Sequence, residues 1–236
     1  MIAESEFTKL MENIGIELDE NDYLLFARYA GLLQEWNEKV NLTAITDDEG
    51  IAIKHFADSL LPLTKIELKE NCRLIDVGTG AGFPSVPMKL IRRDIHLTLL
   101  DSLDKRLTFL RHLCAQLGVD ATMVHARAED AGQDELHRER YDVATSRAVA
   151  SLAELAELCL PLLRRGGLMV ALKGSSGRAE AATAQNAITL CGGTLQEMID
   201  YHLPNGDART LIVIKKSSPT PPKYPRNSAQ ISKRSL

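Results

Sequence analysis

The chain lacks the features of membrane, secreted and metal-binding proteins. None of its apolar runs approaches the ~20 residues that a membrane-spanning helix needs. Residues 1–22 hold seven acids and one lysine, whereas a secretory signal begins with basic residues. The four cysteines show no paired or CxxC spacing, and the six histidines show no ligand spacing. We therefore expect a cytoplasmic protein with reduced core thiols, no membrane partner and no metal site.

Acidic residues are also missing from the end of the chain. Residues 208–236 contain seven basic residues and no acid, although the net charge of the chain is −4. Such a segment is often only soluble surface, but it is also what a phosphate-backbone partner would select. Its stretch SSPTPPKYPRNSAQ is rich in proline and serine, so we expect an irregular tail that becomes ordered on binding. Composition leaves both interpretations of the charge open.

The first third of the chain is predicted to be helical. Apolar residues recur near a 3.6-residue period over residues 20–40, which indicates an amphipathic helix. Thr46 followed by Glu49 matches the capping box of a second helix, which Pro62 would stop. Residues 1–68 are therefore expected to form an N-terminal helical extension.

The middle of the chain alternates strand-like and helix-like segments. The predicted strands are CRLIDV, IHLTLLD, ATMVHA, YDVATS, LMVALK, TLQEMIDYHL and ARTLIVIKK. Helices are expected after the first, second, fourth and fifth of these, with Gly166 and Gly167 ending the helix before the fifth. This order predicts a mostly parallel sheet whose last two strands form an edge hairpin. We expect an α/β, Rossmann-like domain with a seven-stranded sheet over residues 69–216, followed by a basic tail over residues 217–236.

A glycine-rich turn, LIDVGTGAGFP at Leu74–Pro84, carries most of the functional information. Gly78 and Gly80 would let a ligand lie against the backbone, and Gly82 is expected to permit the turn and close helix packing. Asp101 ends the second predicted strand, where an acid can accept hydrogen bonds from ribose hydroxyls. Together these residues predict a nucleoside cofactor.

Three details of the turn favour S-adenosylmethionine over a dinucleotide. The spacing GxGxG is one residue tighter than the GxGxxG fingerprint. Pro84 and Pro87 start the following helix, and Pro84 has no N–H to offer a pyrophosphate. Asp76, two residues before the first glycine, suits an amine-bearing ligand better than a phosphate. An NAD(P)-dependent oxidoreductase and a non-catalytic cofactor-sensing module remain the alternatives.

From about Leu32 to its end, the chain resembles the GidB/RsmG methyltransferases. The resemblance is carried by WNEKVNLTAI, HFADSL, DVGTGAGFP, LLDSLDKRLTFL, HARAED, TSRAVA, VALKG and KYPR, in this order. The chain departs from the family at Ser85-Val86, where Gly-Ile is common, and in its last residues, SAQISKRSL. The resemblance implies a class I S-adenosylmethionine-dependent methyltransferase acting on N7 of a guanine in 16S ribosomal RNA, with S-adenosylhomocysteine as product. It also implies the RNA or the small ribosomal subunit as partner, and we expect a monomer.

The turn and the resemblance together indicate seven cofactor-binding residues. These are Gly78, Gly80, Phe83, Asp101, Ala128, Glu129 and Arg147. Ala128 and Glu129 match the family's adenine-contacting pair, although Glu129 alone would be interpreted as a surface acid. Phe83 could be a packed core residue, and the resemblance favours the pocket. Arg147, after the fourth predicted strand, is expected to touch the cofactor or the guanine.

No catalytic acid or base is assigned. N7 of guanine has an in-plane lone pair and carries no proton, so in-line alignment of N7, methyl carbon and sulfur would suffice. His55 and Asp58 are more consistent with a structural bond between a helix and the domain than with catalysis. Lys173 could meet an RNA phosphate, and Tyr224 could stack on an RNA base. Deleting the tail is expected to weaken RNA binding and to leave cofactor binding nearly unchanged.

Overall fold

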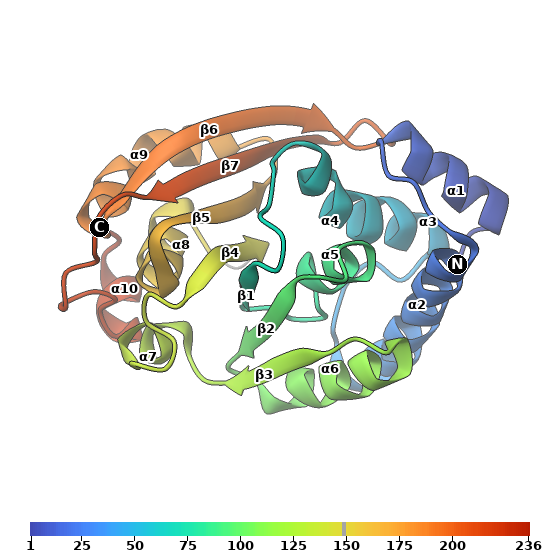
Figure 1. Ribbon diagram of the computed structural model, residues 1–236, viewed down its shortest axis with the longest axis horizontal. Coiled ribbons are helices and arrows are strands. Elements are labelled where there is room, and N and C mark those ends of the chain that lie inside the picture. Colours follow the sequence, from blue (N-terminus) through green and yellow to red (C-terminus); the bar gives the residue numbers. More distant parts are fainter. Residues whose placement is uncertain (148–149) are drawn as a thin grey trace.

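The centre of the molecule is a seven-stranded sheet with helices on both faces, as the computed structural model shows (Figure 1). The structure describes residues 1–147 and 150–236, so Ala148 and Val149 of the TSRAVA motif lie outside the described residues. The strands are β1 (Arg73–Val77), β2 (His96–Asp101), β3 (Ala121–His125), β4 (Tyr141–Arg147), β5 (Leu163–Lys173), β6 (Gly193–His202) and β7 (Ala208–Lys216). Their order is β3-β2-β1-β4-β5-β7-β6. Within the described sheet only β7 runs antiparallel to the other strands, which confirms the predicted mostly parallel sheet with an edge hairpin.

Strand β1 lies in the middle of the sheet and is buried on both faces. Leu74 belongs to the hydrophobic cluster on one face, while Ile75 and Val77 belong to the cluster on the other. A strand covered on both faces needs consecutive apolar residues rather than strict alternation, which explains the sequence LIDV. The glycine turn that follows β1 is therefore held by a rigid, buried strand.

Helices follow the strands along most of the chain. They are α5 (Ser85–Ile91), α6 (Asp104–Leu117), α7 (Ala128–Gln133), α8 (Leu152–Cys159), α9 (Gly177–Leu190) and α10 (Ser228–Lys233). The sequence did not indicate α7 or α10, because six residues are too few to show a helical period. The prediction that Gly166 and Gly167 end a helix is wrong, since both lie inside β5. An added Cβ on Gly167 would lie 2.9 Å from the carbonyl oxygen of Asp142, so glycine there permits close pairing with β4.

The N-terminal helices are α1 (Glu4–Asn13), α2 (Glu20–Val40) and a composite helix. The composite helix runs through α3 (Asp48–Gly50), the π-helical η1 (Ile51–Ala57) and α4 (Asp58–Leu60), and then tightens into the 3₁₀ turn η2 (Leu61–Thr64). Helix α2 confirms the prediction over the same residues, whereas α1 was not predicted. The cap is Asp47 rather than Thr46, because the Asp47 carboxylate accepts a hydrogen bond from the Gly50 N–H at 2.6 Å.

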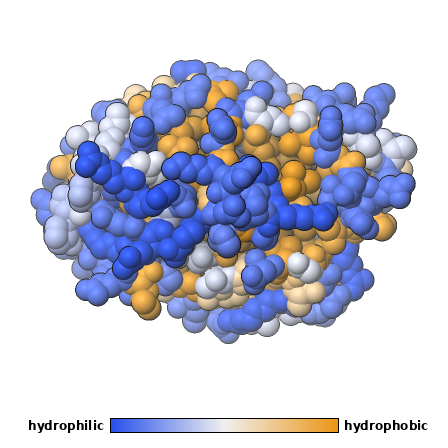
Figure 2. Space-filling view, in the orientation of Figure 1, coloured by the Kyte–Doolittle hydropathy of each residue, from blue (hydrophilic) through white to orange (hydrophobic). Residues whose placement is uncertain are grey.

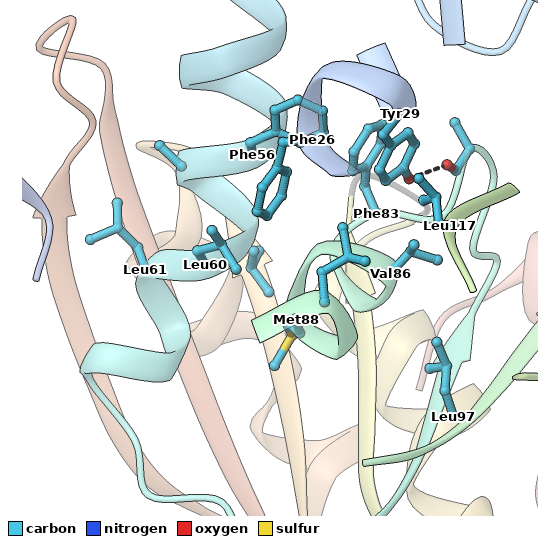
Figure 3. Close-up of a cluster of buried hydrophobic side chains, with 14 of the residues drawn as sticks. Phe26, Tyr29, Phe56, Leu60, Leu61, Phe83, Val86, Met88, Leu97 and Leu117 are labelled. Atoms are coloured by element: carbon cyan, nitrogen blue, oxygen red, sulfur yellow. Dashed lines mark hydrogen bonds between the residues drawn. The ribbon is translucent and has the colours of Figure 1, made fainter. Parts of the chain in front are cut away.

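Aromatic residues join these helices to the glycine turn (Figure 3). The rings of Tyr29 and Phe83 stack with their centroids 5.2 Å apart, and Phe26 and Phe56 pack beside them. The Tyr29 hydroxyl also donates to the Ala81 carbonyl at 2.6 Å. The N-terminal helices thus lie directly behind the turn and share one buried cluster with the sheet. The domain boundary at residue 68 stays a prediction.

The tail, residues 217–236, is packed on the opposite face of the sheet. Tyr224 and Ile231 are buried, and Arg226 forms a two-pronged ion pair with the buried Glu157 of α8, with distances of 2.8 and 2.7 Å. Residues 217–227 form no helix or strand, as predicted, but the prediction that the tail becomes ordered only on binding is wrong, because the tail is packed against the domain. Tyr224 is not free to stack on RNA, because its ring packs in the core cluster with α8 and α9.

The surface in the view of Figure 2 is mostly hydrophilic, with hydrophobic residues exposed chiefly in its right half. No helix in residues 1–147 and 150–236 is long and apolar enough to span a bilayer. Cys72, Cys114, Cys159 and Cys191 are all buried with free thiols, which confirms their predicted place in the core.

Candidate active site

A cavity of about 480 Å³ opens where β1, β2 and β4 reach their carboxyl ends. In open α/β sheets this edge is where ligands bind. The cavity is lined by all seven predicted cofactor-binding residues, Gly78, Gly80, Phe83, Asp101, Ala128, Glu129 and Arg147. The structure thus brings together residues that are up to 69 positions apart in the chain. What each of them binds stays a prediction.

The backbone of the glycine turn is fixed against β2. Gly78 and Gly80 have φ angles of +69° and +60°, in the left-handed region that glycine adopts without strain. The Gly78 N–H donates to the Leu100 carbonyl at 2.9 Å, and the Gly80 N–H donates to Oδ2 of Asp101 at 3.0 Å. The turn and the carboxylate therefore hold each other in place.

Gly80 and Gly82 face different surroundings. A Cβ on Gly82, where φ is +95°, would lie 2.7 Å from Oη of Tyr29 and 2.9 Å from Cγ2 of Val86. This confirms that Gly82 permits close helix packing. A Cβ on Gly80 would meet no atom nearer than 3.9 Å, so the cavity side of Gly80 is open. The turn therefore leaves room for a ligand to lie against its backbone.

Asp101 is buried at the end of β2 with its carboxylate held by three N–H groups. Oδ1 accepts from the Leu103 N–H at 2.9 Å, and Oδ2 accepts from Gly80 and, at 3.4 Å, from Arg106. A carboxylate offers about four acceptor sites, so this one keeps capacity for a further donor. Its place on the cavity wall fits the predicted ribose contact.

The first turn of α7 forms another wall of the cavity. Ala128 and Glu129 line it, and the backbone N–H groups of a first helical turn have no partner inside the helix. Oε1 of Glu129 accepts from Nε of Arg127 at 2.5 Å. Glu129 is buried, so its interpretation as a surface acid is wrong. This wall fits the polar edge of an adenine ring.

Arg147 is the last residue of β4 and is tied to the composite N-terminal helix. Its Nη1 donates to the Lys54 carbonyl at 3.0 Å and to Oδ2 of Asp58 at 3.2 Å, while Nη2 donates to Nδ1 of His55 at 3.0 Å. Asp58 also accepts from Nε of Arg209 at 3.2 Å. The structural role predicted for His55 and Asp58, a bond between helix and domain, is confirmed.

The imidazole of His55 has both nitrogens engaged. Arginine can only donate, so Nδ1 of His55 is an acceptor, and the proton sits on Nε2, which donates to Oγ1 of Thr43 at 2.8 Å. Burial and, secondarily, the charge of Arg147 lower the pKa of His55 to about 3. His55 is therefore a neutral residue that links Thr43 to Arg147, and it has no nitrogen free to accept a proton.

Phe83 is both a core residue and a cavity residue. Its ring is stacked on the His55 imidazole, with centroids 4.4 Å apart and planes at 11°, and the Arg147 guanidinium lies 4.8 Å from its centroid. It is buried among the aromatic residues of the N-terminal helices and still lines the cavity. The two interpretations offered by the sequence are thus both correct.

Asp76 is buried behind the turn and does not line the cavity. Its Oδ2 accepts from the hydroxyls of Thr79 at 2.8 Å and Ser85 at 2.6 Å, whereas Oδ1 has no partner. Burial raises the pKa of Asp76 to about 7. The structure therefore gives Asp76 the role of holding the turn, and Ser85, where the family commonly has glycine, supplies one of the two hydroxyls.

Lys173 also has a structural role. Its Nζ donates to the Ala150 carbonyl at 2.5 Å and lies 2.9 Å from Oε2 of Glu180. The side chain is buried, so the prediction that it meets an RNA phosphate is wrong. Among residues 1–147 and 150–236, no group of three or more His, Cys, Asp or Glu side chains could hold a metal ion.

The site contains further residues that the sequence did not indicate. Leu42 and Thr43, in the NLTAI segment, line the cofactor cavity. A second cavity of about 500 Å³ shares His55 and Arg147 with the first and is also lined by Lys54, Asp58, Lys173, Glu180 and Arg209. The motif containing Thr43 carried part of the family resemblance, and this was the available signal.

The fold is that of the class I S-adenosylmethionine-dependent methyltransferases. A SAM-dependent methyltransferase from Aquifex aeolicus has the same fold, with a TM-score of 0.52 and 14% identity over 71% of this chain and 93% of that chain. A Corynebacterium glutamicum protein gives a TM-score of 0.55 and 17% identity, covering 92% of this chain and 98% of the other.

The family follows from the sequence comparisons. The family model GidB, described as rRNA small subunit methyltransferase G, matches residues 22–210. The ribosomal RNA small subunit methyltransferase G of Alkaliphilus metalliredigens is 46% identical over 227 residues, 95% of each chain, and that of Streptococcus gordonii is 44% identical over 233 residues, 98% of each chain. The chain belongs to the GidB family of small-subunit rRNA methyltransferases, which confirms the resemblance.

Proposed function

We propose that this protein transfers the methyl group of S-adenosylmethionine to N7 of a guanine in 16S ribosomal RNA. The relatives are named as methyltransferases of small-subunit ribosomal RNA, and family membership supports the same class of substrate here. Such a substrate places the enzyme in the cytoplasm, and we propose that it acts there as a monomer. The choice of N7 rests on the resemblance to the GidB/RsmG methyltransferases, and the chemistry of the site supports it.

The residues around the cavity fit S-adenosylmethionine in one orientation. The methionine part would lie against Gly78 and Gly80, which both line the cavity, and the backbone at Gly80 is open there. Asp101 would accept the ribose hydroxyls, and Ala128 with Glu129 would hold the adenine. When bound, the cofactor supplies an activated methyl group on a positively charged sulfur. Phe83 and Arg147 form the wall beside the glycine turn, on the side of the second cavity.

The observation that supports the N7 assignment is that, among the described residues, the wall formed by His55, Phe83 and Arg147 and the adjoining Asp58 offers no available base. Both nitrogens of His55 are engaged, and its pKa is lowered to about 3. Both oxygens of Asp58 accept from arginines. An exocyclic amine or a hydroxyl must lose a proton on methylation, whereas N7 carries none. Such a site can align N7 with the methyl carbon but does not have to remove a proton.

The mouth of the cavity suits a phosphate backbone. Arg106 and Arg127 line it with partly exposed guanidinium groups, and Lys54 and Arg209 line the adjoining cavity. Contacts between cations and RNA phosphates release counterions, so binding should weaken steeply with added salt. We propose that the target nucleotide enters over this rim.

Two measurements test this function. Equilibrium dialysis with labelled S-adenosylmethionine and NADH should show binding of the first alone. Incubation with labelled S-adenosylmethionine and either 16S rRNA or small subunits, followed by digestion to nucleosides, should place the label in N7-methylguanosine. Label in another nucleoside would refute the N7 assignment. Binding without transfer to either substrate would instead support the non-catalytic module.

A further inference from the structure

Helix α7, whose first turn lines the cofactor cavity, has little to hold it in place by itself. It is six residues long, and helices of this length are unstable in isolation. Its buried residues are Glu129, Ala131 and Gly132, so it buries little apolar surface. The position of α7 must therefore be fixed by the segments packed against it.

The tail approaches α7 so closely that no side chain fits between them. An added Cβ on Gly132 would lie 2.7 Å from Cγ and 3.0 Å from Cδ of Pro225. The next residue of the helix, Gln133, donates from Nε2 to the carbonyls of Pro222 at 3.1 Å and Pro225 at 2.9 Å. The C-terminal end of α7 thus rests directly on the tail.

The guanidinium of Arg138 joins the two segments. Its Nη1 donates to the Gly132 carbonyl of α7 at 2.6 Å and to the Tyr224 carbonyl of the tail at 2.8 Å. Its Nη2 donates to the carbonyls of Thr220 at 2.8 Å and Pro221 at 3.3 Å. Hydrogen bonds from a charged donor are stronger than neutral ones, so this single side chain accounts for much of the connection.

The tail is itself a rigid support. Tyr224 is buried, and the hydroxyl of Thr220 donates to the Cys191 carbonyl at 2.7 Å. Arg226 is anchored to Glu157 through its backbone N–H as well as its side chain. A displacement of the tail would therefore be passed to α7 rather than absorbed within the tail.

We propose that the tail is a positioning element for the cofactor site, acting through Arg138 and Pro225 on α7 and hence on the adenine wall. This rests on the proposed function in that it takes S-adenosylmethionine as the ligand of the cavity. It replaces the prediction that loss of the tail leaves cofactor binding nearly unchanged. The tail sequence KYPR then has a role in positioning the cofactor site that is separate from any contact with RNA.

The test uses two point variants of the full-length chain, since deleting the tail would expose the core around Tyr224. Arg138→Met removes the hydrogen bonds that join α7 to the tail. Gly132→Ala places a methyl group against Pro225 and so displaces the tail from α7. Matched controls are Arg111→Met, an exposed arginine on α6, and Gly31→Ala in α2, where a Cβ meets nothing within 4 Å. Calorimetry gives the Kd for S-adenosylhomocysteine, and hydrogen exchange of the ligand-free protein gives the protection of residues 126–134.

Both test variants should weaken S-adenosylhomocysteine binding about tenfold. They should also speed exchange in residues 126–134 with little change in β1 and β2, while both controls behave as wild type. An unchanged Kd in both test variants would overturn the proposal, as would exchange that is faster throughout the chain. These readouts involve no RNA, so a failure of the rRNA assay leaves this result intact, and the reverse also holds.

Discussion

Nη2 of Arg147 donates a hydrogen bond to Nδ1 of His55 over 3.0 Å, and this contact joins the end of β4 to the composite helix at η1. It fixes the tautomer of His55 and leaves the imidazole without a free acceptor. The same guanidinium lies against the ring of Phe83 at the cavity wall. Arg147 therefore forms part of the cavity wall and also occupies the His55 nitrogen that could otherwise accept a proton.

Arg147→Ala should impair methyl transfer while the fold survives. The variant removes the cavity wall next to Phe83 and leaves Asp58 paired with Arg209 alone. We expect turnover to fall at least about tenfold and the free energy of unfolding to fall by about 1–3 kcal/mol. Steady-state kinetics and urea unfolding measure the two effects.

The control for this prediction is Arg178→Ala, which breaks an exposed ion pair with Asp200. Such a pair contributes at most about 1 kcal/mol, so the control should remain near wild type in both assays. Unchanged turnover in Arg147→Ala would remove Arg147 from the site.

Two alanine substitutions in the glycine turn should differ in the property that they impair most: ligand binding for Gly80 and stability for Gly82. Gly80→Ala points its methyl group into open space at the cavity, so it should weaken S-adenosylmethionine binding at a stability cost of about 1–2 kcal/mol. Gly82→Ala drives its methyl group into Tyr29 and Val86 and should cost at least about 2 kcal/mol. Calorimetric binding and chemical unfolding separate the two. Equal loss of stability in both variants would contradict the distinction.

Asp76 should make the protein less stable as the pH rises. Its folded pKa of about 7 lies above the unfolded value of 3.8, so the folded state binds the extra proton between these values. Stability is then fully present below pH 3.8 and is lost as the pH rises through 7, a shift that corresponds to about 4 kcal/mol at most. Relative to wild type, Asp76→Asn should therefore gain stability from pH 4 to pH 7. A difference that is flat with pH would refute this assignment.

His55 should give the opposite slope. Its folded pKa of about 3 lies below the unfolded value of 6.5, so stability is present above pH 6.5 and is lost as the pH falls toward 3. Replacing it with Asn, whose Oδ1 can still accept from Arg147 and which does not titrate, should remove this acid sensitivity. Urea unfolding at several pH values measures this effect. If the stability of His55→Asn falls at low pH as it does in the wild type, the neutral state assigned to His55 is contradicted.

Local patterns predicted the sheet, and the glycine turn together with the family resemblance predicted the residues that line the cavity. Strand-helix alternation determines a parallel sheet, and the glycine turn with Asp101 marks its ligand edge. The contacts of Arg147 were out of reach, because His55 and Asp58 lie about 90 residues away in the chain. Burial of Lys173 was missed for a different reason: its partner Glu180 is near in the chain but belongs to α9, and the packing of α9 against β5 is not visible in the sequence.

The tail shows why composition alone misled. Proline, serine and basic residues are typical of disorder, yet Tyr224 and Ile231 fill core positions, and the charge of Arg226 is matched by the buried Glu157. Helix α7 escaped detection because six residues hold less than two helical turns. Such features depend on which segments meet in three dimensions, and the period of a single segment does not reveal this.

The central claim is methylation of guanine N7 in small-subunit rRNA. Mass spectrometry of nucleosides from 16S rRNA, prepared from cells with and without the gene and from cells that carry the Arg147→Ala variant, tests it most directly. We expect N7-methylguanosine to drop in the deletion strain, to return with the wild-type gene and to remain low with the variant. An N7-methylguanosine content that does not change when the gene is removed would contradict the claim.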